Sequence, residues 1–132
     1  MKISEHLIKA EAFERAIAKL DPRGDGALYA VFLMRAGTNR VNAALHALGI
    51  TTDGAATPVK LGDLNHTYKP ELNAPVPDRL RAAFKHLAFI EDLRPDYVRG
   101  PKPVDGAMVA ACEAAYTAIR TATDTILARD RS

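Results

Sequence analysis

The sequence predicts an all-α protein: an antiparallel four-helix up-and-down bundle with a long loop between the second and third helices. Alanine, the best helix former, occupies 24 of the 132 positions, whereas the β-branched residues valine and isoleucine are sparse. Four stretches repeat apolar residues at steps of three and four, which gives each predicted helix one apolar face. Such helices hide these faces from water by packing together as a bundle.

Composition limits the class of protein. A chain with 48% hydrophobic and 26% charged residues is typical of a globular protein, and residues 1–132 are predicted to form one domain. The formal net charge of +2 is too small for the broad positive field of a dedicated duplex-DNA binder. Cys112 is the only cysteine, which fits a reducing compartment. Charges interrupt the first 20 residues, so we expect a cytoplasmic protein without a membrane span.

The first two predicted helices cover residues 3–20 and about 25–49. Gly49 is expected to cap the second helix, because glycine is common just past a helix end. Its expected apolar face comprises Leu28, Val31, Met34, Val41, Leu45 and Leu48. Residues 50–77 contain four prolines and no sustained period, which predicts a loop. Loops of this length often carry function.

The third predicted helix begins at Asp78 and must break near Pro95, because proline lacks a backbone N–H and disfavours helical angles in the preceding residue. The segment "RPDYVRG", residues 94–100, then has two interpretations. It either ends the helix, with Tyr97 packed against the bundle, or grips an anion through Arg94 and Arg99. A fourth helix is expected after Asp105, with Cys112 as a small core residue.

One polar stripe on the second predicted helix is a candidate binding site. Its members follow at steps of four, three and four: Arg35, Asn39, Asn42 and His46. Such a line could grip phosphate and base edges, or it could be the solvated back of an amphipathic helix. His66, in the polar loop sequence "NHTYK", could close over the stripe. His6 and His86 are expected on the surface.

The sequence indicates no metal site and no cofactor. No glutamate has a histidine three residues later, there is no cysteine pair, and the four histidines lie in separate segments. Neither a glycine-rich phosphate loop nor a serine nucleophile elbow is present, which argues against kinase, hydrolase and dinucleotide-dependent chemistry.

Three stretches resemble the HEPN superfamily of helical-bundle domains: "ALYAVFLMRAGTNRVNAALHALGI", the loop "NHTYK", and a helix closing on "LRPDY". The resemblance spans about residues 27–127. It implies a dimeric bundle associated with nucleotides or RNA, in some members a ribonuclease and in others the partner of a small nucleotidyltransferase.

Ribonuclease members of this superfamily carry an arginine followed after four to six residues by a histidine. Two pairs here have such a spacing, Arg40 with His46 and Arg81 with His86. In neither pair is the residue after the arginine polar, and no histidine follows Arg94, so the resemblance favours binding over catalysis.

Our first hypothesis is a cytoplasmic HEPN-like bundle that binds nucleotide or RNA through Arg35, Asn39, Asn42, His46, His66 and Arg94. Cleavage of RNA would be metal-independent, with His46 as the base that takes a proton from the 2′-hydroxyl. The alternative is a non-catalytic homodimeric protein-interaction module. A third possibility, a small-molecule sensor with the long loop as a lid, has no residue signature.

Overall fold

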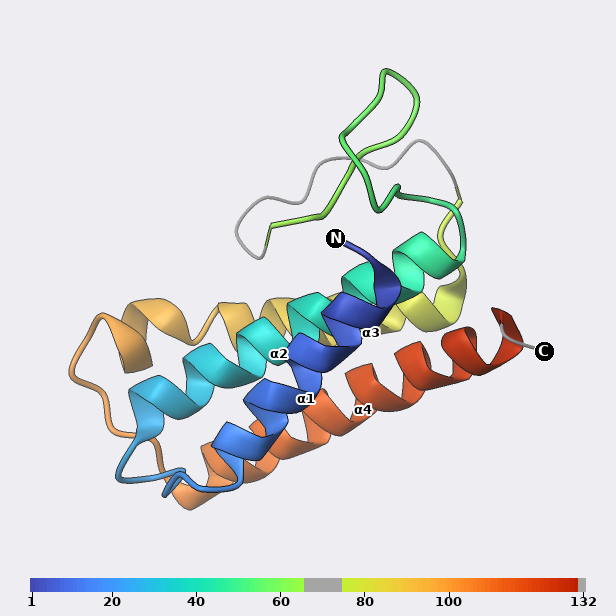
Figure 1. Ribbon diagram of the computed structural model, residues 1–132. Coiled ribbons are helices and arrows are strands. Elements are labelled where there is room, and N and C mark those ends of the chain that lie inside the picture. The colour runs from blue at the N-terminus through green and yellow to red at the C-terminus, as the bar shows by residue number, and fades with distance from the viewer. Residues whose placement is uncertain (66–74, 131–132) are drawn as a thin grey trace.

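The computed structural model describes residues 1–65 and 75–130, and every regular element in them is helical (Figure 1). The elements are α1 (Ile3–Ile17), α2 (Gly26–Ala47), α3 (Asp78–Glu91), a π-helical turn η1 (Arg94–Val98) and α4 (Gly106–Asp130). The predicted all-α class with four helices is therefore confirmed. None of the described helices combines the length and apolar character needed to cross a bilayer.

Helix α2 is the centre of the fold, because it contacts α1, α3, α4 and η1. Of its 22 residues, 14 are buried, so it is covered on nearly all sides rather than along one stripe. Small side chains allow this close packing, and Arg35 and Arg40 are its only residues of the Asp, Glu, Lys and Arg types. The most deeply buried aliphatic side chains come from three helices: Leu45, Leu80, Leu87, Ile90 and Ile119.

Two residues of the predicted apolar face of α2 are exposed instead. Leu28 is 45% exposed and Leu48 is 39% exposed. Leu28 lies in the first turn of α2, and Leu48 is the C-cap residue, so both lie at the ends of the helix, where fewer neighbours cover it.

Gly49 ends α2 as predicted. It has a φ of +72°, and its N–H donates to the carbonyl of His46 while the N–H of Ile50 donates to that of Leu45. These two bonds form a Schellman motif, which requires a left-handed residue after the helix. The motif turns the chain back so that Thr51 reaches the side chain of His46.

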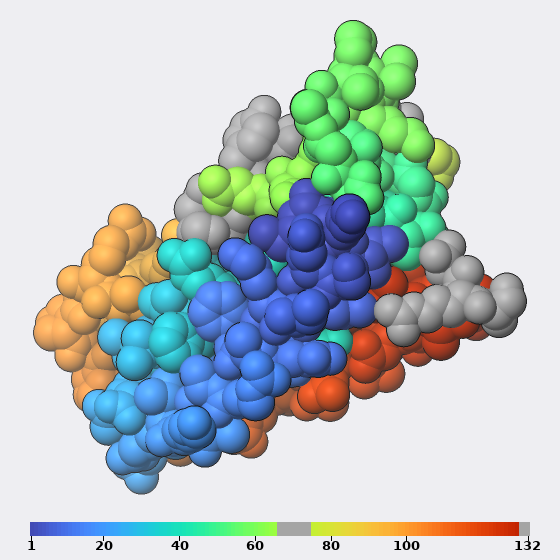
Figure 2. Space-filling view, in the orientation of Figure 1, coloured from blue at the N-terminus to red at the C-terminus, as the bar shows by residue number. Residues whose placement is uncertain are grey.

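In its described parts, the connection between α2 and α3 has no helix, and one buried amide ties it to α2. The side chain of Asn42 accepts a hydrogen bond from the N–H of Leu64 (2.7 Å) and donates to the Leu64 carbonyl (2.9 Å). Figure 2 shows the connection rising above the bundle, with the start of α1 against its base. The connection is thus held at the end of α2 that carries His46.

The segment after α3 confirms that the third helix stops before Pro95. Helix α3 ends at Glu91, and the N–H of Arg99 donates to the carbonyl of Arg94 (2.8 Å) across one wide turn. The ring of Tyr97 is partly buried against the core, as predicted. Gly100 is required for close packing, since a Cβ there would lie 2.7 Å from the Pro95 carbonyl oxygen.

The start of α4 also follows the prediction, whereas the start of α3 differs from it. The N–H of Met108 donates to the carboxylate of Asp105 (2.8 Å), a side-chain cap. The sequence also offered Asp78 as the cap of the third helix, but Asp78 is the first residue of α3 and Pro77 occupies the cap position. Its carboxylate accepts a hydrogen bond from Arg81 instead.

We predict that Gly49→Ala lowers the free energy of unfolding by about 1–2 kcal/mol, because a left-handed conformation strains an L-residue with a side chain. Gly106→Ala is the matched control. Gly106 is the first residue of α4, and a Cβ there meets nothing within 4 Å. The control should therefore unfold in urea at the wild-type concentration or slightly above it. Equal losses of unfolding free energy in the two variants would contradict the need for a left-handed residue at Gly49.

Candidate functional site

Three side chains from three segments meet at the end of α2 that faces the connection: His6 of α1, His46 of α2 and Asp63. One carboxylate oxygen of Asp63, Oδ1, lies 2.9 Å from Nε2 of His6 and 2.7 Å from Nε2 of His46. Both histidines are buried, at 3% and 9% exposure, whereas the Asp63 side chain is 36% exposed. We call these three residues the His–His–Asp cluster.

The other ring nitrogen of each histidine also faces an oxygen. Nδ1 of His6 lies 2.8 Å from Oδ1 of Asn39, and Nδ1 of His46 is bonded to the hydroxyl of Thr51. The amide of Asn39 is oriented by a second bond, because its Nδ2 donates to the carbonyl of Arg35 (2.8 Å). Asn39 therefore presents an acceptor to His6, and Nδ1 of His6 carries a proton.

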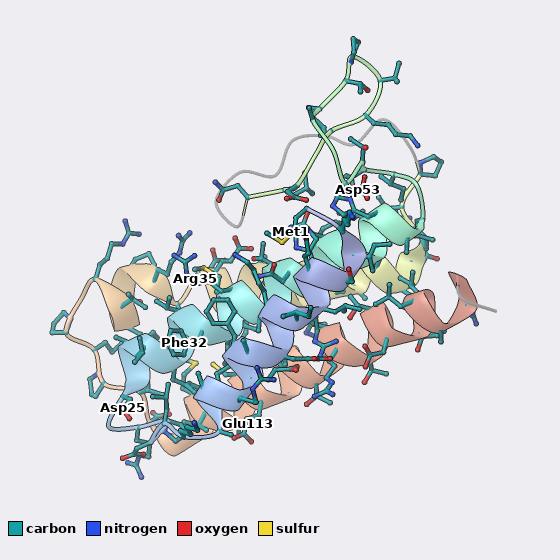
Figure 3. The ribbon with its side chains drawn as sticks, viewed as in Figure 1. Met1, Asp25, Phe32, Arg35, Asp53 and Glu113 are labelled. Atoms are coloured by element: carbon teal, nitrogen blue, oxygen red, sulfur yellow. The ribbon has the colours of Figure 1, made fainter. Side chains whose placement is uncertain are left out.

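Asp63 collects several hydrogen-bond partners. One of these partners is a cation: the ammonium of Met1 donates to Oδ2 of Asp63 (3.0 Å) and to the carbonyl of Asp53 (2.9 Å), and Figure 3 shows Met1 beside Asp53. The other two are the imidazoles of His6 and His46, at Oδ1. Partial burial opposes ionisation of Asp63, but the hydrogen bonds from His6, the Met1 ammonium and His46 outweigh it and lower its pKa to about 2. Asp63 is thus a carboxylate at neutral pH.

The predicted polar stripe on α2 is split by the fold. Asn42 is 2% exposed and bonded to the backbone of Leu64, and His46 belongs to the cluster. These two are neither solvated nor available as an open groove, because α1 and the connection cover them. Asn39 is partly exposed and Arg35 is exposed. His6, expected on the surface, is buried because it follows Ile3 and precedes Ala10 on the inner face of α1.

Arg35 and Asn39 line a small hollow between α1 and α2, in which Lys9 and Phe13 of α1 face them. Its volume is about 130 Å³. Within the described part of the chain, the ammonium of Lys9 and the guanidinium of Arg35 make no hydrogen bond or ion pair, and both are exposed. We call this surface the Arg35 hollow. Figure 3 shows Arg35 and Phe32 along the same helix.

Two other predicted site residues are not brought to this region. Arg94 belongs to η1, which lies near the opposite end of α2 from the connection (Figure 1), and its Nε donates to the carbonyl of Glu91 (3.2 Å). His66 lies outside the described residues.

Arg40, the second arginine of α2, is part of a buried ionic network. Its guanidinium donates to both carboxylate oxygens of Glu14 (2.9 and 3.1 Å), to the Tyr116 hydroxyl and to Asp124. Burial opposes ionisation of Glu14, yet hydrogen bonds from Arg40 and Tyr116 hold its pKa below the usual value. Burial and the bond to Glu14 raise the pKa of Tyr116. The network joins α1, α2 and α4.

The two arginine–histidine spacings of the HEPN resemblance do not form a joint site. Arg40 and His46 lie about 120° apart around a helix of 3.6 residues per turn, and they share no partner. Arg81 is exposed and bonded to Asp78, while His86 is exposed on α3 as expected. An arginine positioned beside a catalytic imidazole is thus absent from these pairs.

Sequence reasoning did not find His6 or Asp63 as site residues. His6 could have been found, because it continues the helical spacing of Ile3 and Ala10 toward the core. The sequence around Asp63 gives no sign of a site, since only the path of the connection brings this residue next to the two histidines. His6 and His46 come from separate segments of the chain, yet both reach one carboxylate oxygen of Asp63. Separation in the sequence therefore does not exclude a shared metal site here.

Comparisons with protein-family profiles, with curated proteins and with solved structures found no match for this chain.

We predict that Asp63→Asn destabilises the protein at neutral pH and that this difference narrows as the pH falls from about 4 toward 2. A carboxyl group whose pKa is lowered on folding contributes stability above its unfolded pKa of about 3.9 and loses it as the folded pKa is approached. Urea unfolding of both proteins between pH 2 and 7 measures the difference. A difference in unfolding free energy that stays constant between pH 2 and 7 would contradict the ionic role of Asp63.

We predict that Arg40→Met lowers the free energy of unfolding by about 3 kcal/mol, because it leaves the Glu14 carboxylate largely buried without its main partner. Arg120→Met is the control. Arg120 also pairs with Glu14, at 3.4 Å, but is 54% exposed, so its loss should cost less than about 1 kcal/mol. Urea unfolding of both variants tests this, and equal losses would contradict a buried anchor at Arg40.

Proposed function

We propose that this chain is a cytoplasmic HEPN-like protein that binds RNA or a nucleotide, with weak or no catalysis. The proposed architecture is an antiparallel up-and-down bundle with a long loop between α2 and α3, and the course of the chain in Figure 1 supports it. The observation that carries the proposed function is the Arg35 hollow, where two exposed cations, which have no ion pair among the described residues, flank an aromatic ring.

The hollow offers the groups that recognise a nucleic-acid strand. Lys9 and Arg35 are exposed like charges on adjacent helices, and a bound phosphate would pair with both and offset part of their repulsion. Phe13 is partly exposed beside them, its ring 5.5 Å from that of Phe32, which fixes its position for stacking on a base. Asn39 and Thr38 add hydrogen-bonding groups.

The size of the hollow favours a single strand over an enclosed nucleotide. A volume of about 130 Å³ is below that of pockets that bury a small-molecule ligand, roughly 300–1,000 Å³. One phosphate fits inside, and sugar and base remain on the surface. Proteins that bind single-stranded RNA combine cations with aromatic rings in this way.

Binding without efficient cleavage follows from the surroundings of His46 and Arg40. Both ring nitrogens of His46 have hydrogen-bond partners, and the side chain is 9% exposed. Arg40 is 3% exposed and fully engaged in its ionic network. Neither is presented to a 2′-hydroxyl or phosphate at the surface.

The second candidate function is a homodimeric interaction module, and a groove between α3 and α4 favours it. The groove has a volume of about 610 Å³ and is lined mainly by alanine and threonine, with Arg79 and His86 at its border. Phe89, 38% exposed, follows His86 on the same face of α3. Small side chains leave room for a helix of a second copy of this chain.

We predict that the wild-type chain co-sediments with single-stranded RNA at low salt and that Arg35→Ala and Lys9→Ala each weaken binding for all RNA sequences. Each lost phosphate contact should also reduce the slope of log affinity against log salt by about 1. Lys85→Ala, an exposed lysine on α3, is the control and should bind as the wild type does.

The same sedimentation run gives the mass of the protein. A dimer that binds no RNA, and that Ala118→Arg in the α3–α4 groove converts to a monomer, would replace the first candidate with the second. A monomer that binds no RNA at low salt would contradict both.

A further inference from the structure

We propose that the His–His–Asp cluster is a binding site for one divalent ion of the first transition series, with Zn²⁺ as the expected ion. The ligand atoms are Nε2 of His6, Nε2 of His46 and Oδ1 of Asp63, which all lie within 4.8 Å of one another. None of these three ligands lines the Arg35 hollow, and the proposal does not rest on the proposed RNA binding.

The hydrogen-bond geometry around His6 places its Nε2 directly opposite a carboxylate oxygen of Asp63. Nδ1 of His6 carries a proton, because it faces the carbonyl oxygen of the oriented Asn39 amide. In a neutral imidazole, Nε2 is then an unprotonated acceptor, yet it lies 2.9 Å from a carboxylate oxygen. Two acceptors at this distance repel each other unless a proton or a metal ion lies between them.

The partners of the two Nδ1 atoms favour a metal ion. Histidines that ligate a metal through one ring nitrogen usually donate the other N–H to an oxygen, which fixes the ring orientation. His6 meets this condition through the oriented amide of Asn39, and for His46 the hydroxyl of Thr51 is placed to accept such a bond. Two buried imidazoles therefore direct their remaining nitrogens toward the same carboxylate oxygen.

The donor set identifies the class of ion. Two imidazole nitrogens and one carboxylate oxygen suit Zn²⁺ and its neighbours in the transition series, whereas Ca²⁺ and Mg²⁺ prefer oxygen ligands alone. Cys112, the only thiol, is buried in α4 among core residues and does not contribute a soft ligand. Three protein ligands leave a coordination position open to solvent or substrate.

The ligand side chains must adjust slightly to make room for an ion. Ligand atoms of a tetrahedral Zn²⁺ site are separated by roughly 3.4 Å, so the contacts of 2.7 and 2.9 Å must lengthen by about half an ångström. His6 and His46 are fixed on helices, whereas Asp63 lies on the connection and is 36% exposed. Movement of Asp63 lengthens these two contacts and gives the ion a path from solvent. Rotation of the two imidazole side chains is also needed, because the ligand atoms lie within 4.8 Å of one another and must reach the same spacing around the ion.

The test is metal uptake by the full chain carrying a histidine-free tag at its C-terminus, which leaves the Met1 contact intact. After chelation and dialysis, Co²⁺ is titrated at pH 7.5 and followed by visible absorption, and Zn²⁺ then displaces it. We expect one ion per chain. Asp63→Asn should weaken Co²⁺ binding by at least about 10-fold, and Asn39→Ala by about 10-fold to 100-fold through loss of the oriented Nδ1–H.

His86→Ala, which removes an exposed histidine on α3, is the control and should bind as the wild type does. Circular dichroism of each variant separates loss of the site from loss of the fold. If His6→Ala or His46→Ala does not fold, Asp63→Asn decides the test. The proposal is overturned if the wild type takes up no Co²⁺ or Zn²⁺, since a proton then occupies the cluster. It is equally overturned if folded Asp63→Asn binds the ions as tightly as His86→Ala does.

Discussion

The burial of α2 on nearly all sides is the constraint on which the rest of this structure depends. A helix in that position needs a hydrogen-bond partner for every polar side chain that it buries, because an unpaired polar group costs several kcal/mol away from water. Three such residues, Arg40, Asn42 and His46, lie within two turns of one another. Arg40 is satisfied by α1 and α4, whereas the connection supplies partners for both Asn42 and His46. No buried polar side-chain atom in the described residues lacks a partner.

These partners explain why an irregular segment is well placed at one end of the bundle. Leu64 is fixed by two hydrogen bonds to Asn42, and Thr51 is fixed to His46 directly after the Schellman turn. Asp63 precedes Leu64, so the amide that anchors the connection also presents a carboxylate to the two imidazoles. The stability of the fold and the geometry of the cluster therefore depend on the same contacts.

The two proposed sites are neighbours that share two residues, Met1 and Asn39. Met1 lines the Arg35 hollow and donates its ammonium to Asp63. Asn39 lines the Arg35 hollow and also accepts the hydrogen bond from Nδ1 of His6. The hollow is cationic and exposed, whereas the cluster is anionic at Asp63 and mostly buried. Anions and metal cations would thus bind at distinct surfaces of the same end of α1 and α2, and Met1 and Asn39 are the physical links between them.

The sequence by itself determined the helical class, the four helices, the break before Pro95 and the caps at Gly49 and Asp105, because these depend on local propensity, spacing and backbone chemistry. It also identified Arg35 and Asn39 as members of a polar stripe on α2, but only the structure shows that these two members of the stripe are accessible. Only the tertiary structure decided that Asn42 and His46 are buried, that His6 is not on the surface, and that Arg40 and His46 act apart. It alone brought Asp63 to the histidines. Helical periodicity gives the direction in which a side chain points from the helix axis. Which other element covers the side chain depends on packing between segments that are distant in the chain.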